Sequence, residues 1–203
     1  MKKLILILCA IFLLGGCRPK VQVVYPVSQM DFMLNTITKI TVYTYEGKED
    51  PKELIDQCYE LMKGYEKLLS RTIEGSDIYK INHAKGAAVT VDEETAQLLE
   101  KALAFSKLTD GAFDPTVEPV SSMWNFVDDG FIPPDEETVA QAAEHIDYRN
   151  IEIKGNVIRL LDPEAAIDLG GVAKGYIGDK GAAFLKEHGV TGAVLDVYKR
   201  QPL

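Results

Sequence analysis

A pair of glycines between an apolar run and an amphipathic segment constrains this chain more than any other feature. The apolar residues 165–167 lead to Asp168, then Gly170 and Gly171 follow, and apolar side chains recur at helical spacing after them. This order predicts a strand at 165–169, a tight turn and a helix at 171–188. Because the first N–H groups of a helix attract anions, the segment indicates a phosphorylated ligand. Asp168 is then available for a metal ion such as Mg²⁺ or for a ligand hydroxyl, and a turn without any ligand is the alternative.

The N-terminal residues have the pattern of a bacterial lipoprotein signal. Two lysines precede an apolar run at 4–14, which is too short to span a bilayer, and Leu14-Gly15-Gly16-Cys17 follows it. Leu-Gly-Gly-Cys resembles a lipobox, so we expect residues 1–16 to be a signal peptide and Cys17 to carry lipid. Residues 17–29 would then tether an extracytoplasmic domain to the bacterial cell membrane. An ordinary secretory signal with an incidental cysteine is the alternative.

The charge and the remaining cysteines narrow the classes of partner. The formal net charge is −9, with 22 basic and 31 acidic residues, which argues against nucleic acid as a partner. Cys9 leaves with the signal and Cys17 would carry lipid, so Cys58 has no cysteine left to pair with. Cys58 lies in an apolar stripe of helical spacing, which predicts a buried core residue and not a nucleophile.

Helices and strands alternate irregularly along the chain. The patterns predict helices at 51–69, 76–82, 92–108, 114–124, 135–145 and 171–188, and strands at 37–45, 87–91, 151–153, 157–161, 165–169 and 193–197, with a loop at 127–134. Side chains of Ser76, Asp92, Asp114 and Asp135 are the expected helix caps, and the helix that Asp114 opens would carry Trp124. Strict β-α-β order is missing, so an α+β fold is expected and not a doubly wound one.

The last residues differ in character from those before them. An apolar strand at 193–197 belongs inside a sheet, whereas residues 198–203 are polar and lack a cap. We therefore expect residues 30–197 to be part of a domain that is truncated at its C-terminus, and residues 198–203 to be a non-native tail.

Four motifs in a fixed order carry a family resemblance. Neither a Walker loop nor a dinucleotide fingerprint is present. The motifs are Leu34-Asn35-Thr36 before a strand, Ser70-Arg71 followed by 76–82 (SDIYKIN), 111–115 (GAFDP) with Trp124, and 168–176 (DLGGVAKGY). Over residues 30–196 the chain resembles the ApbE-type FAD:protein FMN transferases. This resemblance implies a mixed, mainly antiparallel sheet packed with helices, of T-fold-like architecture and incomplete at the C-terminus.

The resemblance also implies a reaction and a set of contacts. Enzymes of this type cleave FAD in the presence of Mg²⁺, transfer FMN to a Thr or Ser hydroxyl of an extracytoplasmic flavoprotein such as a redox-pump subunit, and release AMP. By position, the FAD contacts would be Leu34, Thr72, Ala112, Phe113, Asp114, Asp168 and Lys174, and the Gly171 carbonyl would be a ligand of Mg²⁺. The other metal ligands and the catalytic base belong to a C-terminal segment that this sequence lacks. Because Mg²⁺ prefers six oxygen ligands, we expect the 203-residue chain to be inactive by itself.

Two other functions remain open from the sequence. A lipid-anchored protein that binds a flavin or another small ligand without catalysis fits the signal and the acidic domain equally well. An FAD pyrophosphatase would use water in place of the acceptor hydroxyl. A purely structural envelope lipoprotein is the least favoured, because it gives no reason for Asp168 before paired glycines.

Overall fold

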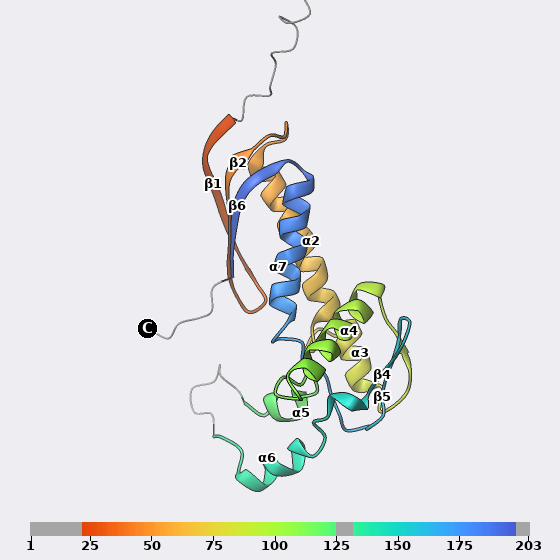
Figure 1. The fold of residues 1–203 in the computed structure, drawn as a ribbon. Coiled ribbons are helices and arrows are strands. Elements are labelled where there is room, and N and C mark those ends of the chain that lie inside the picture. Colours follow the sequence, from red (N-terminus) through yellow and green to blue (C-terminus); the bar gives the residue numbers. More distant parts are fainter. Residues whose placement is uncertain (1–21, 125–131, 198–203) are drawn as a thin grey trace, which may run out of the picture. The chain divides into compact units, whose positions relative to one another are not determined.

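A computed structural model describes residues 22–124 and 132–197 (Figure 1). The chain divides into two compact units: the first comprises Met1–Tyr59 and Ala182–Leu203, and the second comprises Glu60–Gly181. Helix α2 (Pro51–Leu69) and helix α7 (Ala173–Glu187) each contribute residues to both units. The expected signal peptide, Cys17 and the tail at 198–203 lie outside the described residues, as does most of the loop expected at 127–134.

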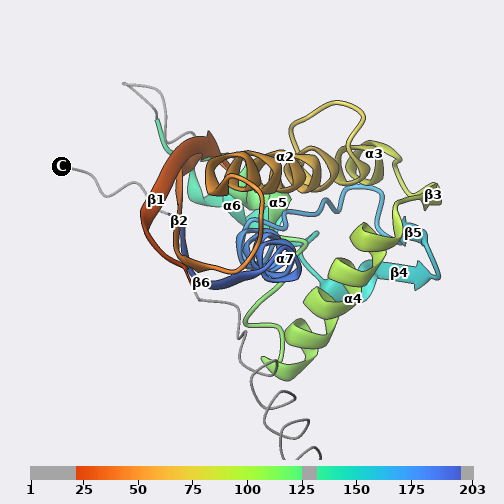
Figure 2. The same cartoon turned by 90° about the horizontal axis from the view of Figure 1, so that it is seen from above.

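The first unit contains an antiparallel sheet in the order β1-β2-β6. Its strands are β1 (Gln22–Met33), β2 (Thr36–Tyr45) and β6 (Val190–Val197), and they lie alongside α2 and α7 (Figure 2). The strands predicted at 37–45 and 193–197 are confirmed. Leu34 and Asn35 form the β1–β2 turn, both with φ of 54°, a geometry in which a two-residue hairpin loop matches the twist of its strands.

Strand β1 corrects one prediction from the sequence. Of the residues expected to form a tether, 22–29 lie in β1, where Gln22, Val23 and residues 27–29 pair with β2. The register shifts between Val23 and Val27, on either side of Pro26. Proline cannot donate a ladder hydrogen bond, so it is found at edge strands and irregularities and weakens the strand pattern in the sequence. An edge strand interrupted by proline therefore lacks the pattern that predicts a strand.

The core of the first unit lies between the sheet and α2. Ile40 and Val42 of β2 and Leu54, Ile55 and Cys58 of α2 have no exposed surface. The Tyr59 hydroxyl accepts a hydrogen bond from Ile40 N (3.1 Å) and lies 2.9 Å from the Thr38 carbonyl oxygen, to which it donates. Burial raises the pKa of the Cys58 thiol to about 12, which confirms the prediction of a core residue.

The second unit contains most of the helices and a smaller antiparallel sheet. Helices α3 (Asp77–His83), α4 (Glu93–Leu108) and α6 (Glu136–Ala143) begin after the predicted caps Ser76, Asp92 and Asp135, each of which accepts a backbone hydrogen bond. The sheet has the order β3-β5-β4. Its strands are β3 (Val89–Thr90), β5 (Val157–Leu160) and β4 (Ile151–Lys154), which follows the short helix η1 (Tyr148–Asn150).

Both sheets are antiparallel and are packed with helices, so the predicted α+β class is confirmed. The predicted hairpin is formed by β4 and β5. The strand predicted at 87–91 shortens to the two residues of β3. Across the described ranges, no helix has the length and apolar character needed to cross a membrane.

Candidate functional site

The segment that precedes the paired glycines is extended but is not a strand. The strand predicted at 165–169 is wrong: apart from one isolated parallel bridge between Ala166 and Val117, these residues join no sheet. The Asn82 side chain accepts a hydrogen bond from Ile167 N (2.7 Å) and donates one to Ile167 O (2.9 Å). Asp168 N donates to the Pro115 carbonyl (2.8 Å). Because an amide side chain and a loop pair these backbone groups, a neighbouring strand is not required.

The Asp168 carboxylate is held from three directions. Its Oδ1 accepts a hydrogen bond from Gly170 N (2.7 Å), and its Oδ2 accepts one from the Ser121 hydroxyl (3.2 Å). Oδ2 also forms an ion pair with Nε of Arg71 (3.2 Å), while Nη1 of Arg71 donates to Oε1 of Glu118 (3.2 Å). The side chains of Asp168, Arg71 and Glu118 are 21%, 32% and 20% exposed, so the cluster is partly open to solvent.

These contacts favour one of the two roles predicted for Asp168. An ionised carboxylate can accept about four hydrogen bonds, so Oδ1 retains the capacity for a further donor. A second cation at the same oxygen would compete with the guanidinium of Arg71. Throughout the described ranges, no three His, Cys, Asp or Glu side chains gather as a metal site. The geometry therefore suits a ligand hydroxyl or N–H better than a metal ion at Asp168.

The turn into α7 uses most of its amides internally. Gly170 N donates to Asp168, and the N–H groups of Val172 and Ala173 both donate to the Leu169 carbonyl (2.9 and 2.7 Å). Within the part of the chain that the structure describes, Gly171 N is the one amide from Gly170 to Ala173 without an acceptor. Between Gly170 and Ala173, the row of free amides expected for a phosphate is therefore reduced to one exposed donor.

An aromatic side chain lies directly against the second glycine. A Cβ atom placed on Gly171 would lie 3.1 Å from Cε2 of Phe113, so the absence of a side chain allows this close approach. Phe113 also meets Phe105 of α4 edge to face, with ring centroids 5.4 Å apart. Phe113 N donates to the Thr109 hydroxyl (3.1 Å) at the end of α4, and the exposed Ala112 precedes it. Phe113 and Gly171, both predicted site residues, are thus brought together.

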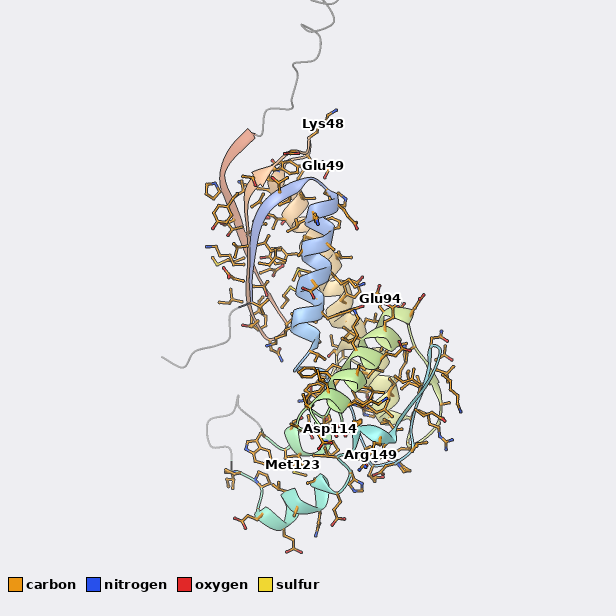
Figure 3. All side chains as sticks on the ribbon, in the orientation of Figure 1. Lys48, Glu49, Glu94, Asp114, Met123 and Arg149 are labelled. Atoms are coloured by element: carbon orange, nitrogen blue, oxygen red, sulfur yellow. The ribbon has the colours of Figure 1, made fainter. Side chains whose placement is uncertain are left out.

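Asp114 has a different structural role from the one predicted. It does not cap a helix, because α5 covers only Glu118–Ser121 and begins after Val117. Its Oδ1 accepts hydrogen bonds from the backbone N (2.8 Å) and hydroxyl (2.6 Å) of Thr116. Its Oδ2 accepts one from Tyr148 N (2.8 Å), which ties this loop to η1 (Figure 3). The local turn and this distant donor together hold both oxygens of Asp114. Trp124, which the predicted helix would carry, lies beyond the end of α5.

The remaining predicted FAD contacts are Thr72, Lys174 and Leu34. Thr72 is exposed and its N–H donates to the Ser70 hydroxyl (3.2 Å), so it lies in a local turn beside Arg71. Lys174 lies in the first turn of α7 and forms no ion pair with any described residue. Leu34 belongs to the first unit, at the β1–β2 turn.

A second polar cluster holds α7 against α4. Tyr176 donates a hydrogen bond to Glu94, the residue of α4 that is labelled in Figure 3, and Nζ of Lys180 lies 2.7 Å from Glu94 Oε2. Lys101 lies 5.0 Å from the centre of the Tyr176 ring. The hydrogen bond from Lys180 lowers the pKa of Glu94. Burial, and to a lesser extent the hydrogen bond to Glu94, raises the pKa of Tyr176. The cluster fixes the helix that follows the glycine turn.

Sequence reasoning assigned no role to Arg71, Glu118, Ser121 or Asn82. Arg71 and Asn82 lie within the motifs that carry the family resemblance, and their place in these motifs is the signal that could have identified them. Glu118 and Ser121 belong to a short helix that the sequence placed differently, so their approach to Asp168 had no local signature.

The family model that matches this chain is that of the ApbE family, over residues 34–198, and the chain belongs to this family. It is 27% identical to an FAD:protein FMN transferase of Treponema pallidum, over 96% of this chain and 55% of that protein. It is 25% identical to one of Vibrio cholerae, over 97% of this chain and 59% of that protein. The crystal structure of the ApbE protein from Thermotoga maritima superimposes with a TM-score of 0.77 at 32% identity, covering 85% of this chain and 57% of that one.

These comparisons confirm the family resemblance and the fold class. The chain spans a little over half the length of the two transferases that it matches.

Proposed function

We propose that the second unit binds FAD and that the protein carrying it transfers FMN from FAD to a Thr or Ser hydroxyl of a flavoprotein, with release of AMP. Membership of the ApbE family and the names of the relatives support this reaction class. The observation that carries the proposal is the Asp168 carboxylate, which Arg71 and Ser121 hold beside the Gly170–Gly171 turn with acceptor capacity remaining on Oδ1.

Each residue of the site has a role in this proposal. Asp168 accepts a hydrogen bond from an N–H or O–H of the nucleotide. Gly171 N donates to a phosphate oxygen, and Lys174 supplies a positive charge to the diphosphate from the first turn of α7. Phe113 offers an apolar surface to the ring system, with Ala112 and Asp114 beside it in the same loop. Thr72 is a proposed contact through the family resemblance alone, whereas Leu34 belongs to the first unit and is given no role at this site.

Magnesium enters the proposal through the same resemblance. The Gly171 carbonyl is the one predicted ligand that the chain supplies, and Asp168 is already paired with a guanidinium. The described residues include no cluster of acidic and His side chains that would complete an octahedral site. They therefore do not fit a full magnesium site, and we propose that this chain by itself binds FAD without transferring FMN.

The proposed location follows from the N-terminal motif. Lipid on Cys17 would hold the protein at the outer face of the bacterial cell membrane, where two acyl chains give stable anchoring. An extracytoplasmic flavoprotein, such as a redox-pump subunit, would then be the acceptor.

Calorimetric titration with FAD tests the binding step. We expect FAD to bind the full chain, AMP to compete with it, and Asp168→Ala to weaken it. Absence of FAD uptake, or equal uptake by wild type and Asp168→Ala, contradicts the proposal. Riboflavin binding as tightly as FAD would favour the alternative of a general flavin-binding protein, since a transferase of this type must recognise the AMP half.

Product analysis tests the chemistry. The chain is incubated with FAD, Mg²⁺ and an acceptor domain that carries the target Thr, and covalent flavin fluorescence is read on a denaturing gel. We expect no labelled acceptor from this chain, and labelling would show that it contains the complete machinery. Release of AMP without any acceptor would favour the FAD pyrophosphatase alternative.

A further inference from the structure

Arg71 connects two carboxylates that come from different parts of the second unit. It lies two residues after the end of α2, whereas Glu118 begins α5 and Asp168 precedes the glycine turn. Its Nε faces Oδ2 of Asp168 and its Nη1 faces Oε1 of Glu118, both at 3.2 Å. One guanidinium therefore sets the separation between the two acidic groups.

The guanidinium is suited to this task in a way that an ammonium group is not. Its donors lie in one plane at fixed angles, so holding one carboxylate determines where the other must lie. Lysine would present a compact charge on a flexible stem and could not fix both directions at once. Without any cation, the two carboxylates would repel each other across a partly solvent-excluded site.

The contacts also divide the two oxygens of Asp168. Arg71 and Ser121 both engage Oδ2, whereas Oδ1 has one local partner, Gly170 N. Arg71 thus keeps one oxygen occupied and leaves the other available on the side of the glycine turn.

We propose that Arg71 is a positioning residue for the FAD site: it holds Oδ2 of Asp168 so that Oδ1 faces the nucleotide, and Glu118 holds Arg71. This inference rests on the proposed binding of FAD. It assigns Arg71 no direct contact with the ligand, and it predicts that Glu118, which reaches the nucleotide only through Arg71 and Asp168, affects affinity.

The test measures FAD affinity of the full chain by titration calorimetry, with folding checked by circular dichroism. Arg71→Ala is expected to weaken FAD binding about 10- to 30-fold, because it removes a charge-assisted interaction from the carboxylate that binds the ligand. Guanidinium chloride, added below the concentration that alters the circular dichroism spectrum, should restore most of the affinity, and equal sodium chloride should not. A contact that only stabilises the fold predicts no such recovery.

Two further variants accompany Arg71→Ala: the first is a control and the second is an independent test. Arg159→Ala removes an exposed arginine whose Nε donates to the Gly86 carbonyl (2.7 Å) elsewhere in the same unit, and it should leave FAD affinity within about twofold of wild type. Glu118→Gln keeps Arg71 but weakens its second anchor, and it should reduce affinity about threefold. If Arg71→Ala does not fold, Glu118→Gln decides the question alone.

The outcomes separate the inference from the proposal beneath it. Wild-type chain that takes up no FAD overturns both. Wild-type uptake with unchanged affinity in Arg71→Ala overturns the positioning role and leaves the proposed function intact. A loss that guanidinium does not recover, or unchanged affinity in Glu118→Gln, overturns it as well.

Discussion

Asp77 and Asp168 are carboxylates of the same unit, and each has three polar partners. Asp77 accepts hydrogen bonds from Asp92 N (2.7 Å) and the Thr95 hydroxyl (2.9 Å), and it pairs with Lys80 (3.3 Å). Its side chain is 5% exposed, against 21% for Asp168. The first joins the start of α3 to the start of α4, whereas the second lies beside an open glycine turn.

This difference shows how two similar sets of partners serve different purposes. Burial makes the cost of losing a partner high, because an exposed donor can turn to water and a buried one cannot. Asp77 is therefore expected to contribute mainly to stability. Asp168, which solvent can reach, is expected to contribute mainly to ligand binding. Substitutions at the two carboxylates test this division.

Replacing Asp77 should produce the largest loss of stability. In Asp77→Ala, the Thr95 hydroxyl, which is fully buried, and Asp92 N lose their acceptor. We expect the free energy of unfolding to fall by about 3 kcal/mol, measured by urea denaturation. Asp77→Asn retains the shape and one acceptor and should lose less. A change in FAD affinity larger than the change in stability would contradict the division between the two carboxylates.

Replacing Asp168 should give the opposite result. Asp168→Ala is expected to weaken FAD binding by about tenfold or more, while the free energy of unfolding changes by about 1 kcal/mol or less, because its partners are partly exposed. Calorimetry and urea denaturation on the same preparation measure both quantities. Loss of stability comparable to that of Asp77→Ala would show that Asp168, like Asp77, contributes mainly to stability.

The glycine turn allows a sharper test with a matched control. In Gly171→Ala the new Cβ would lie 3.1 Å from Phe113 and push the ring aside, so we expect FAD affinity to fall about threefold. Gly175, in the first turn of α7, has open space around the corresponding position. Gly175→Ala should therefore keep FAD affinity and raise stability by about 0.5–1 kcal/mol, as alanine is the better helix former. Equal affinities in the two variants would show that Phe113 and Gly171 do not shape the site.

The sequence predicted the parts of the fold that depend on neighbouring residues. Ser76, Asp92 and Asp135 cap their helices through donors two or three residues away, so short motifs sufficed to place them. The site depends on distant pairs instead. Asn82 binds Ile167, and Arg71 reaches Asp168 across nearly 100 positions of the chain, and neither spacing leaves a periodic pattern.

The two wrong predictions at the site have the same origin. Asp114 before Pro115 has the local pattern of a helix start, but the Tyr148 amide takes one of its oxygens and Thr116 takes the other. The apolar residues at 165–169 have the composition of a strand, but Asn82 takes the hydrogen bonds that a partner strand would make. Tertiary contacts replaced local preference in both segments. The residue types of the site could be read from its motifs, whereas its geometry could not.

The cluster around Glu94 gives the smallest expected effect and a test by pH. The hydrogen bond from Lys180 lowers the pKa of Glu94 below its usual value of 4.5, so the folded state holds the ionised form more strongly than the unfolded state does. This contribution is fully present above about pH 5 and is lost as the pH falls through the lowered pKa. Because the side chain is 30% exposed, we expect Glu94→Gln to cost about 1 kcal/mol or less at pH 7 and almost nothing well below pH 4. Urea denaturation at both pH values measures it, and a deficit that does not shrink in acid would show that Glu94 acts through packing and not through its charge.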